Sequence, residues 1–221
     1  MTFVNRSDAG RKLALALSSY KGEDVVVLAL PRGGVQVAAE VAIHLAAPLD
    51  LLLVRKIGLP SQPELAMGAV VDGAEPIVVR NDRVIRLARV SAEEFDAACA
   101  RELAEIDRRR RRYLGSRPPE PVAGRVVIIV DDGIATGATV LAAIRGLRRR
   151  EPRKIVLAVP VAPPDEVEEL RGEVDDLICL QTPERFGAIG YFYDEFRQLS
   201  DEDVVRMMEW AREAEDKRKP I

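Results

Sequence analysis

Two adjacent carboxylates, Asp131 and Asp132, directly follow a run of apolar residues in the segment VVIIVDDGIATGAT (126–139). Acids at the end of a buried strand need hydroxyl groups, a cation or water as partners, because an unpaired buried charge is costly. The residues behind them are small or carry hydroxyls: Gly133, Ala135, Thr136, Gly137, Ala138 and Thr139. A helix that starts there offers free N–H groups to a phosphate. Acids for sugar hydroxyls beside amides for a phosphate indicate a sugar phosphate as ligand.

Two further strand ends carry groups that could bind a second anion. Arg32, Gly33 and Gly34 follow the apolar run VVVLAL (25–30). This strand end therefore offers a cation, glycine backbone without side chains, and the N-terminus of the next helix. Arg55 and Lys56 follow the run LDLLLV (49–54). For Lys56, an ordinary surface cation is the alternative interpretation.

The apolar runs that precede these groups predict the fold. Runs at 25–30, 49–54, 125–130 and 154–161 are too continuously apolar for a half-exposed sheet, and a fifth strand is expected at 174–180. Helical segments at 34–46, 138–150 and 165–171 alternate with them. This alternation predicts an α/β fold with a doubly wound, mostly parallel sheet, in one domain over residues 1–221.

Residues 57–120 interrupt the alternation and are interpreted as an insertion. A short pair of strands is expected near 67–71 and 76–80. A Ser91–Glu94 capping box then predicts a long amphipathic helix to about Tyr113. Its last turns carry five consecutive arginines (108–112). They indicate either a solvated helix end or a patch for RNA or another anion.

The C-terminal part holds an aromatic segment, about 181–199, and then a helix expected at 200–216. Five of the ten Phe, Tyr and Trp residues lie within 186–196. They form either a small satellite core or a platform for a flat ligand.

The bulk composition sets limits on the function. The formal net charge is −3, so the chain has no global attraction to nucleic acid or to anionic membranes. It has no run long enough to span a membrane and no signal-peptide core, which predicts a cytoplasmic location. Cys99 and Cys179 are expected to be free thiols, and His44 a packing or surface residue.

The segment 126–139 resembles the phosphoribosyl-diphosphate motif of the type I phosphoribosyltransferases: an apolar strand, two acids and a T-G-x-T loop. The resemblance implies that Asp131 and Asp132 bind the ribose hydroxyls and that Ala135 to Thr139 bind the 5′-phosphate, with Gly133 also in this site. It also implies that Arg32, Gly33 and Gly34 form the pyrophosphate loop, supported by Arg55 and Lys56. The insertion would then serve as a lid, and the aromatic segment as the hood over the base.

The resemblance implies an enzyme, a pentosyltransferase that moves ribose 5-phosphate to a nitrogenous, purine-like base and releases pyrophosphate with the aid of Mg²⁺. Phe186 would stack on the base, Asp194 would lie near the metal, and Arg197 near the pyrophosphate. Asp131, Asp132 and Lys56 would be the catalytic residues. Substrates are then small molecules, with no nucleic acid or membrane partner expected, and a homodimer is compatible with the sequence.

Two departures from the family pattern leave the acceptor open. The 6-oxopurine enzymes have an acid that contacts the base at the position of Ala135, whereas adenine enzymes have none. They also have a strand lysine that reads the 6-oxo group, and it has no evident counterpart near the fourth apolar run. The hood, in contrast, resembles the 6-oxopurine group. A protein of the same fold that senses phosphoribosyl diphosphate or binds RNA, without catalysis, is the alternative. A phosphoribosyl-diphosphate synthetase shares the acids, but the chain is short for one.

Overall fold

The core is a parallel sheet of five strands in a computed structural model that describes residues 2–217. The order across the sheet is β2-β1-β6-β7-β8. The strands are β1 (Val25–Ala29), β2 (Leu49–Leu51), β6 (Val126–Val130), β7 (Lys154–Val161) and β8 (Asp176–Gln181). All neighbouring pairs in this sheet are parallel, so the carboxyl ends of the strands meet at one edge.

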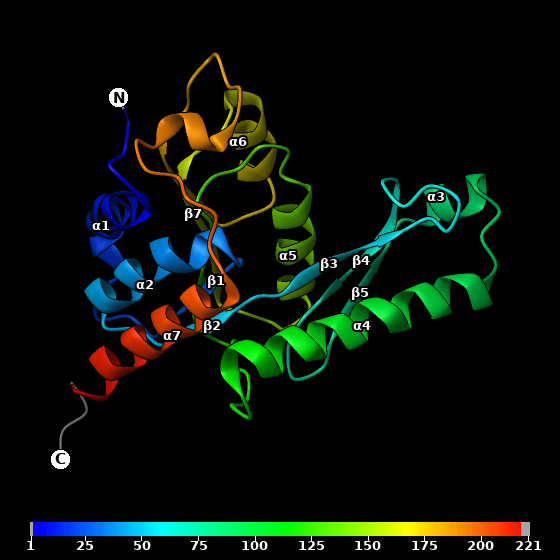
Figure 1. Ribbon diagram of the computed structural model, residues 1–221, viewed down its shortest axis with the longest axis horizontal. Coiled ribbons are helices and arrows are strands. Elements are labelled where there is room, and N and C mark those ends of the chain that lie inside the picture. The colour runs from blue at the N-terminus through cyan, green and yellow to red at the C-terminus, as the bar shows by residue number, and fades with distance from the viewer. Residues whose placement is uncertain (1, 218–221) are drawn as a thin grey trace.

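Helices cover both faces of this sheet, which explains the continuous apolar runs (Figure 1). One face packs against α1 (Arg6–Ala16), α2 (Gly33–Leu45) and α7 (Asp201–Asp216). The other packs against α5 (Ala138–Arg148) and α6 (Pro164–Arg171). Alternate residues of β1 and β6 enter the two cores, and all ten are buried.

Residues 54–114 form an arm that projects from the core (Figure 1). Its antiparallel sheet consists of β3 (Val54–Gly58), β4 (Ala66–Val71) and β5 (Ile77–Arg80). A short helix, α3 (Asp82–Leu87), leads to the long helix α4 (Ala92–Leu114), which runs beneath the sheet and back to the core. The predicted Ser91–Glu94 capping box is present at the start of α4.

A buried ion pair joins the arm to the core. The Arg110 guanidinium of α4 lies 3.0 Å from Asp50 Oδ2 in β2. It also lies 2.6 Å from Oδ2 of Asp72, the residue that directly follows β4. Both carboxylate side chains are only 3% exposed. Burial raises the pKa of Asp72 even though Arg110 opposes the rise. Arg110 is therefore part of a structural joint, which is neither the solvated helix end nor the anion patch expected for the arginine run.

The hood segment between β8 and α7 has only one short element, the 3₁₀ helix η2 (Ile189–Phe192). Tyr193 is buried against Phe3, with ring centroids 5.4 Å apart, so the hood shares a small satellite core with the N-terminus. A second 3₁₀ helix, η1 (Ser18–Tyr20), follows α1. None of the helices within residues 2–217 has the length and apolar character that a membrane crossing requires.

The structure differs from the sequence prediction in helices α1 and α3, which were not predicted, and in the strand expected at 49–54. Helix α1 was not predicted, although Asn5 caps it by accepting a hydrogen bond from the Asp8 N–H. The expected strand 49–54 is split, because β2 ends at Leu51 and β3 begins at Val54 in the sheet of the arm. The insertion therefore starts about three residues earlier than expected and contains three strands.

Candidate functional site

The carboxyl edge of the core sheet contains a cavity of about 220 Å³, which we call the edge cleft. Three strand ends and the arm contribute to it. Its lining consists of Leu30, Pro31, Leu52, Leu53, Val54, Arg55, Arg109, Asp131 and Thr139. The cleft thus brings together one acid, one hydroxyl and two guanidinium groups from segments far apart in the sequence.

The two motif acids have different surroundings. Asp131 lines the edge cleft, and burial, followed by the nearby Asp132 charge, raises its pKa well above the ordinary value. Asp132 is buried and accepts a hydrogen bond of 2.7 Å from Nε of Arg6, whose guanidinium lies 3.8 Å from the Phe196 ring centroid. Asp131 is therefore the acid open to a ligand, while Asp132 is held in an ion pair.

The hood is joined directly to this acidic pair. The Tyr193 hydroxyl donates a hydrogen bond of 2.6 Å to the backbone carbonyl of Asp132. Burial raises the pKa of Tyr193, so the phenol stays protonated and keeps this donor at neutral pH. The segment that would cover a ligand is thus connected to the end of β6.

The loop 133–139 leads into helix α5 with an open N-terminus. Gly137 is the N-cap with φ of 60°, a left-handed conformation that favours glycine. No side chain caps the helix, and its first turn carries no acid. Ala135, Thr136 and Thr139 are exposed. The hydroxyls of Thr136 and Thr139 that are expected to hold a phosphate are therefore accessible, whereas the Ala138 N–H donates to the carbonyl oxygen of Thr136.

The loop of Pro31 to Gly34 packs tightly against the acids. The Pro31–Arg32 peptide is cis, and α2 begins at Gly33. A Cβ on Gly33 would lie 2.0 Å from Asp132 Oδ2, and one on Gly34 would lie 2.7 Å from the Val130 carbonyl oxygen. Both glycines are needed because the backbone approaches the motif too closely for a side chain.

Replacing Gly33 with alanine is expected to lower the free energy of unfolding by about 1–3 kcal/mol, as overpacking commonly does. Asp132 cannot move aside without losing its ion pair with Arg6. Urea denaturation measures the change. Gly172→Ala is the matched control, because its Cβ would meet no atom closer than 3.6 Å. Equal losses in both variants would contradict the crowding at Gly33.

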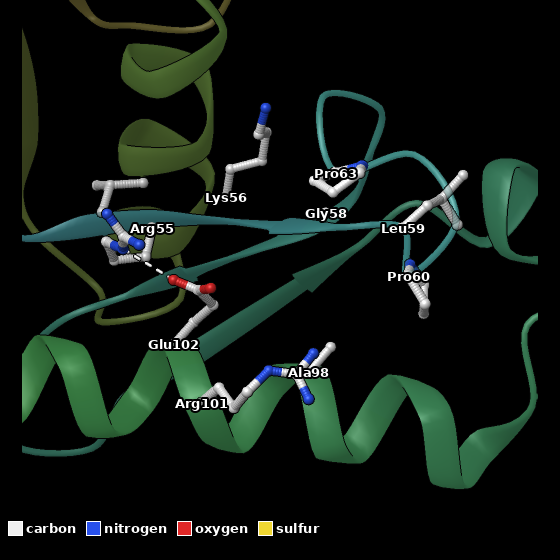
Figure 2. A pocket seen from close by; sticks show the side chains of 10 residues that line it. Arg55, Lys56, Gly58, Leu59, Pro60, Pro63, Ala98, Arg101 and Glu102 are labelled. Atoms are coloured by element: carbon white, nitrogen blue, oxygen red, sulfur yellow. Dashed lines mark hydrogen bonds and ion pairs between the residues drawn. The ribbon is translucent and has the colours of Figure 1, made fainter.

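Arg55 and Lys56 point to opposite sides of β3 (Figure 2). Arg55 Nε donates a hydrogen bond of 2.8 Å to Glu102 of α4, and Arg55 also lines the edge cleft. Lys56 Nζ lies 3.1 Å from Glu64 in the loop after β3. The structure thus brings Arg55, rather than Lys56, beside Asp131. A second cavity of about 390 Å³, between β3 and α4, is lined by both.

The predicted hood residues lie apart from the edge cleft lining. Phe186 stacks on Phe192, with ring centroids 5.3 Å apart and an interplanar angle of 26°. Asp194 is exposed. Arg197 Nη1 donates to Asp203 at the start of α7, and its carbonyl accepts from Arg6. Arg32 lies 3.8 Å from Asp201 of the same helix.

Sequence reasoning did not single out Arg6, Arg109 or Tyr193 as site residues. Arg6 lies 126 positions from Asp132, and Tyr193 lies 61 positions away. No local pattern indicates such contacts. Arg109 was noticed only as a member of the arginine run, and nothing in the run distinguishes it from its neighbours.

Comparison with known proteins gives one family over most of the chain. The profile described as phosphoribosyl transferase domain matches residues 5–195. A protein named putative phosphoribosyl transferase from Mycobacterium tuberculosis strain H37Rv is 48% identical over 209 residues, which is 95% of this chain. The chain spans 47% of that protein's length.

Two further comparisons cover a solved structure and a shorter match. The crystal structure of TT1426 from Thermus thermophilus is 42% identical, has a TM-score of 0.83, and aligns over 95% of this chain and 99% of that one. Uracil phosphoribosyltransferase from Streptomyces griseus is 36% identical over 80 residues, which cover 34% of this chain and 38% of that protein.

Proposed function

The chain belongs to the phosphoribosyl transferase domain family, and on that premise we propose that it transfers ribose 5-phosphate from phosphoribosyl diphosphate to a purine-like base. The observation that carries the proposal is the edge cleft, where Asp131 and Thr139 face Arg55 across the end of β1. A carboxylate for ribose hydroxyls thus lines one cavity together with a cation and a residue from the first turn of α5.

In the proposed reaction, the bond from ribose C1 to the diphosphate oxygen breaks and a bond from C1 to a ring nitrogen of the base forms. Pyrophosphate leaves with the bonding electrons, and the base releases the proton of that nitrogen. Positive charge builds on the ribose ring during the transfer, and the fixed Asp131 carboxylate would stabilise it. The loop 133–139 would hold the 5′-phosphate and so orient C1 toward the base.

We propose that Mg²⁺ enters with the diphosphate. Residues 2–217 contain no group of three or more His, Cys, Asp or Glu side chains placed to hold a metal ion. A hard cation that keeps its waters and substrate oxygens needs few protein ligands, so Asp131 in the edge cleft is the candidate. Asp194, which the resemblance places near the metal, is exposed and lies outside this lining. The ion would neutralise charge on the leaving diphosphate.

The proposed acceptor is a purine-like base bound under the hood. Phe186 and Phe192 already stack on each other, and a flat base could extend this stack. Ala135 offers no acid to the base, which favours an acceptor that needs no such contact, as in the adenine enzymes that the loop resembles.

The test is pyrophosphate release from phosphoribosyl diphosphate and Mg²⁺ with a panel of purine and pyrimidine bases. Base-dependent release is expected with at least one purine. The variant with Thr136→Ala and Thr139→Ala is expected to lose most of this turnover, because two exposed hydroxyls of the phosphate loop are removed.

Absence of release with every base would contradict the proposed transfer. If the protein nevertheless bound phosphoribosyl diphosphate, the alternative of a non-catalytic sensor would be favoured. RNA binding through the arginine run has less support, because Arg108 is paired with Glu105, Arg110 is buried, and Arg112 is paired with Glu202.

A further inference from the structure

Arg109 of the inserted helix faces the edge cleft, whereas its neighbours in the arginine run face elsewhere. It lines the same cavity as Asp131 and Thr139. Its Nε donates a hydrogen bond of 2.7 Å to Glu105, one turn earlier on α4. No acceptor within residues 2–217 bonds to its Nη nitrogens, so they remain available to a ligand.

Arg55 is held in the same way by the same helix. Its Nε donates to Glu102, which leaves the Nη nitrogens without an acceptor in the described part of the chain. Glu102, Glu105 and Arg109 stand at positions i, i+3 and i+7 of α4 and so lie on one face of it. This face therefore orients two guanidinium groups at one cavity.

The sheet order shows which part of a donor would meet these groups. Asp131 and Thr139 follow β6, while Arg55 follows β2, and β1 lies between them. Strands spaced about 4.8 Å apart put the β2 end about 10 Å from the β6 end. For a donor with its 5′-phosphate on the loop after β6, the two arginines in the cleft lie on the side of β1, β2 and the arm, so this is the side that attracts its other charged group.

The loop after β1 also approaches Arg109. Burial, with a hydrogen bond to Asp201, raises the pKa of Tyr113 to about 12, and the charges of Arg109 and Arg32 both oppose this rise. Arg32 also lies 3.8 Å from Asp201, which accepts the hydrogen bond of Tyr113, so Arg109 and Arg32 both lie near this phenol. Together with Arg55, they form a positive group on three different elements.

From this placement we propose that Arg109 is a diphosphate-binding residue, supplied by the inserted helix and acting with Arg55 on the leaving group of the donor. The inference rests on the proposed function. An arginine presents a planar pair of N–H donors that matches two phosphate oxygens, and its positive charge would also stabilise the pyrophosphate as it leaves.

The experiment compares three ligands by isothermal titration calorimetry: phosphoribosyl diphosphate with Mg²⁺, pyrophosphate with Mg²⁺, and ribose 5-phosphate. Arg109→Gln is expected to weaken the first two by about 10- to 100-fold, the range of a charged hydrogen bond. Binding of ribose 5-phosphate, which has no diphosphate, should stay unchanged. Arg109→Lys keeps the positive charge but loses the planar pair of N–H donors, so an intermediate loss of affinity is expected.

Arg108→Gln is the matched control. Arg108 binds the same Glu105, but its side chain is 62% exposed and lines neither cavity at the arm. The Arg108→Gln variant should bind all three ligands with the affinity of the wild type. Thermal denaturation of each variant checks that the fold is retained. If Arg109→Gln unfolds, the same binding comparison is made with Arg109→Lys.

Two results would overturn the inference while the proposed function stands: wild-type affinities in Arg109→Gln, or an equal loss for ribose 5-phosphate. The second would assign Arg109 to the sugar phosphate half of the donor. If the wild type itself failed to bind phosphoribosyl diphosphate, the proposed function would fail and this inference with it.

Discussion

Replacing Arg110 with alanine is expected to lower the free energy of unfolding by about 3–5 kcal/mol, the cost of removing one partner from a buried ion pair. The change would leave the carboxylates of Asp50 and Asp72 buried without their cation. Asp50 would retain only the backbone N–H groups of Leu51 and Glu120 as donors. Denaturation in urea, followed by circular dichroism, measures the loss.

Two controls separate this ion pair from a general effect of shortening an arginine. Arg111→Ala, at the exposed next position, should change stability by no more than about 0.5 kcal/mol. In an Asp72→Asn background, Arg110→Ala should lower the free energy of unfolding by less than in the wild type. Only one buried carboxylate, that of Asp50, would then lose its ion-pair partner. A loss in Arg110→Ala as small as that in Arg111→Ala would refute the structural joint.

Asp131→Asn is expected to lower kcat/KM for the proposed transfer by about 100- to 1,000-fold, as the loss of one preorganised electrostatic group does in other active sites. The amide would keep its oxygen for the Asp132 N–H, now bonded at 2.8 Å, but would lose the negative charge near the ribose ring. Steady-state pyrophosphate release measures the effect. A loss below about tenfold would contradict the role of Asp131.

The pH dependence of this activity follows from the same carboxylate. Burial raises the pKa of Asp131, so wild-type kcat/KM should fall as the pH drops through that raised value and the carboxylate is protonated. Asp131→Asn should lack this part of the profile. At neutral pH the Asp131→Asn variant should be no less stable than the wild type. A buried acid with a raised pKa lowers the free energy of unfolding once it is ionised, and the variant lacks this acid.

The core sheet was predictable because its signals are local. Strands covered on both faces read as continuous apolar runs, and the short turns to α2 and α5 put the charged loops at one edge. The arm was predictable only in part. The five arginines point in different directions around α4, at about 100° per residue, so the sequence alone does not show which one is buried. Partners 60 and 38 positions away decide this for Arg110.

The candidate site also contains some residues that were predictable from local sequence and others that depend on distant packing. The loops that contain Gly33, Asp131 and Thr139 are each recognisable from a short segment and come together because they end parallel strands. Arg6 and Arg109 depend instead on how α1 and α4 pack, which no local pattern encodes. Lys56 was expected to be catalytic from the resemblance at this strand end, whereas the alternation of side chains along β3 separates it from Arg55 (Figure 2).

Helix α4 is one unbroken rod from Ala92 to Leu114, and its anchored end contains both Arg110 and Arg109. From Arg109 to Ala92 the helix extends about 26 Å, at about 1.5 Å per residue. A tilt of about 5° at the anchored end would therefore displace the far end by about 2 Å. If α4 tilted as a rigid rod about the Arg110 ion pair, a small rotation beside the edge cleft would therefore be amplified along the helix toward the tip of the arm.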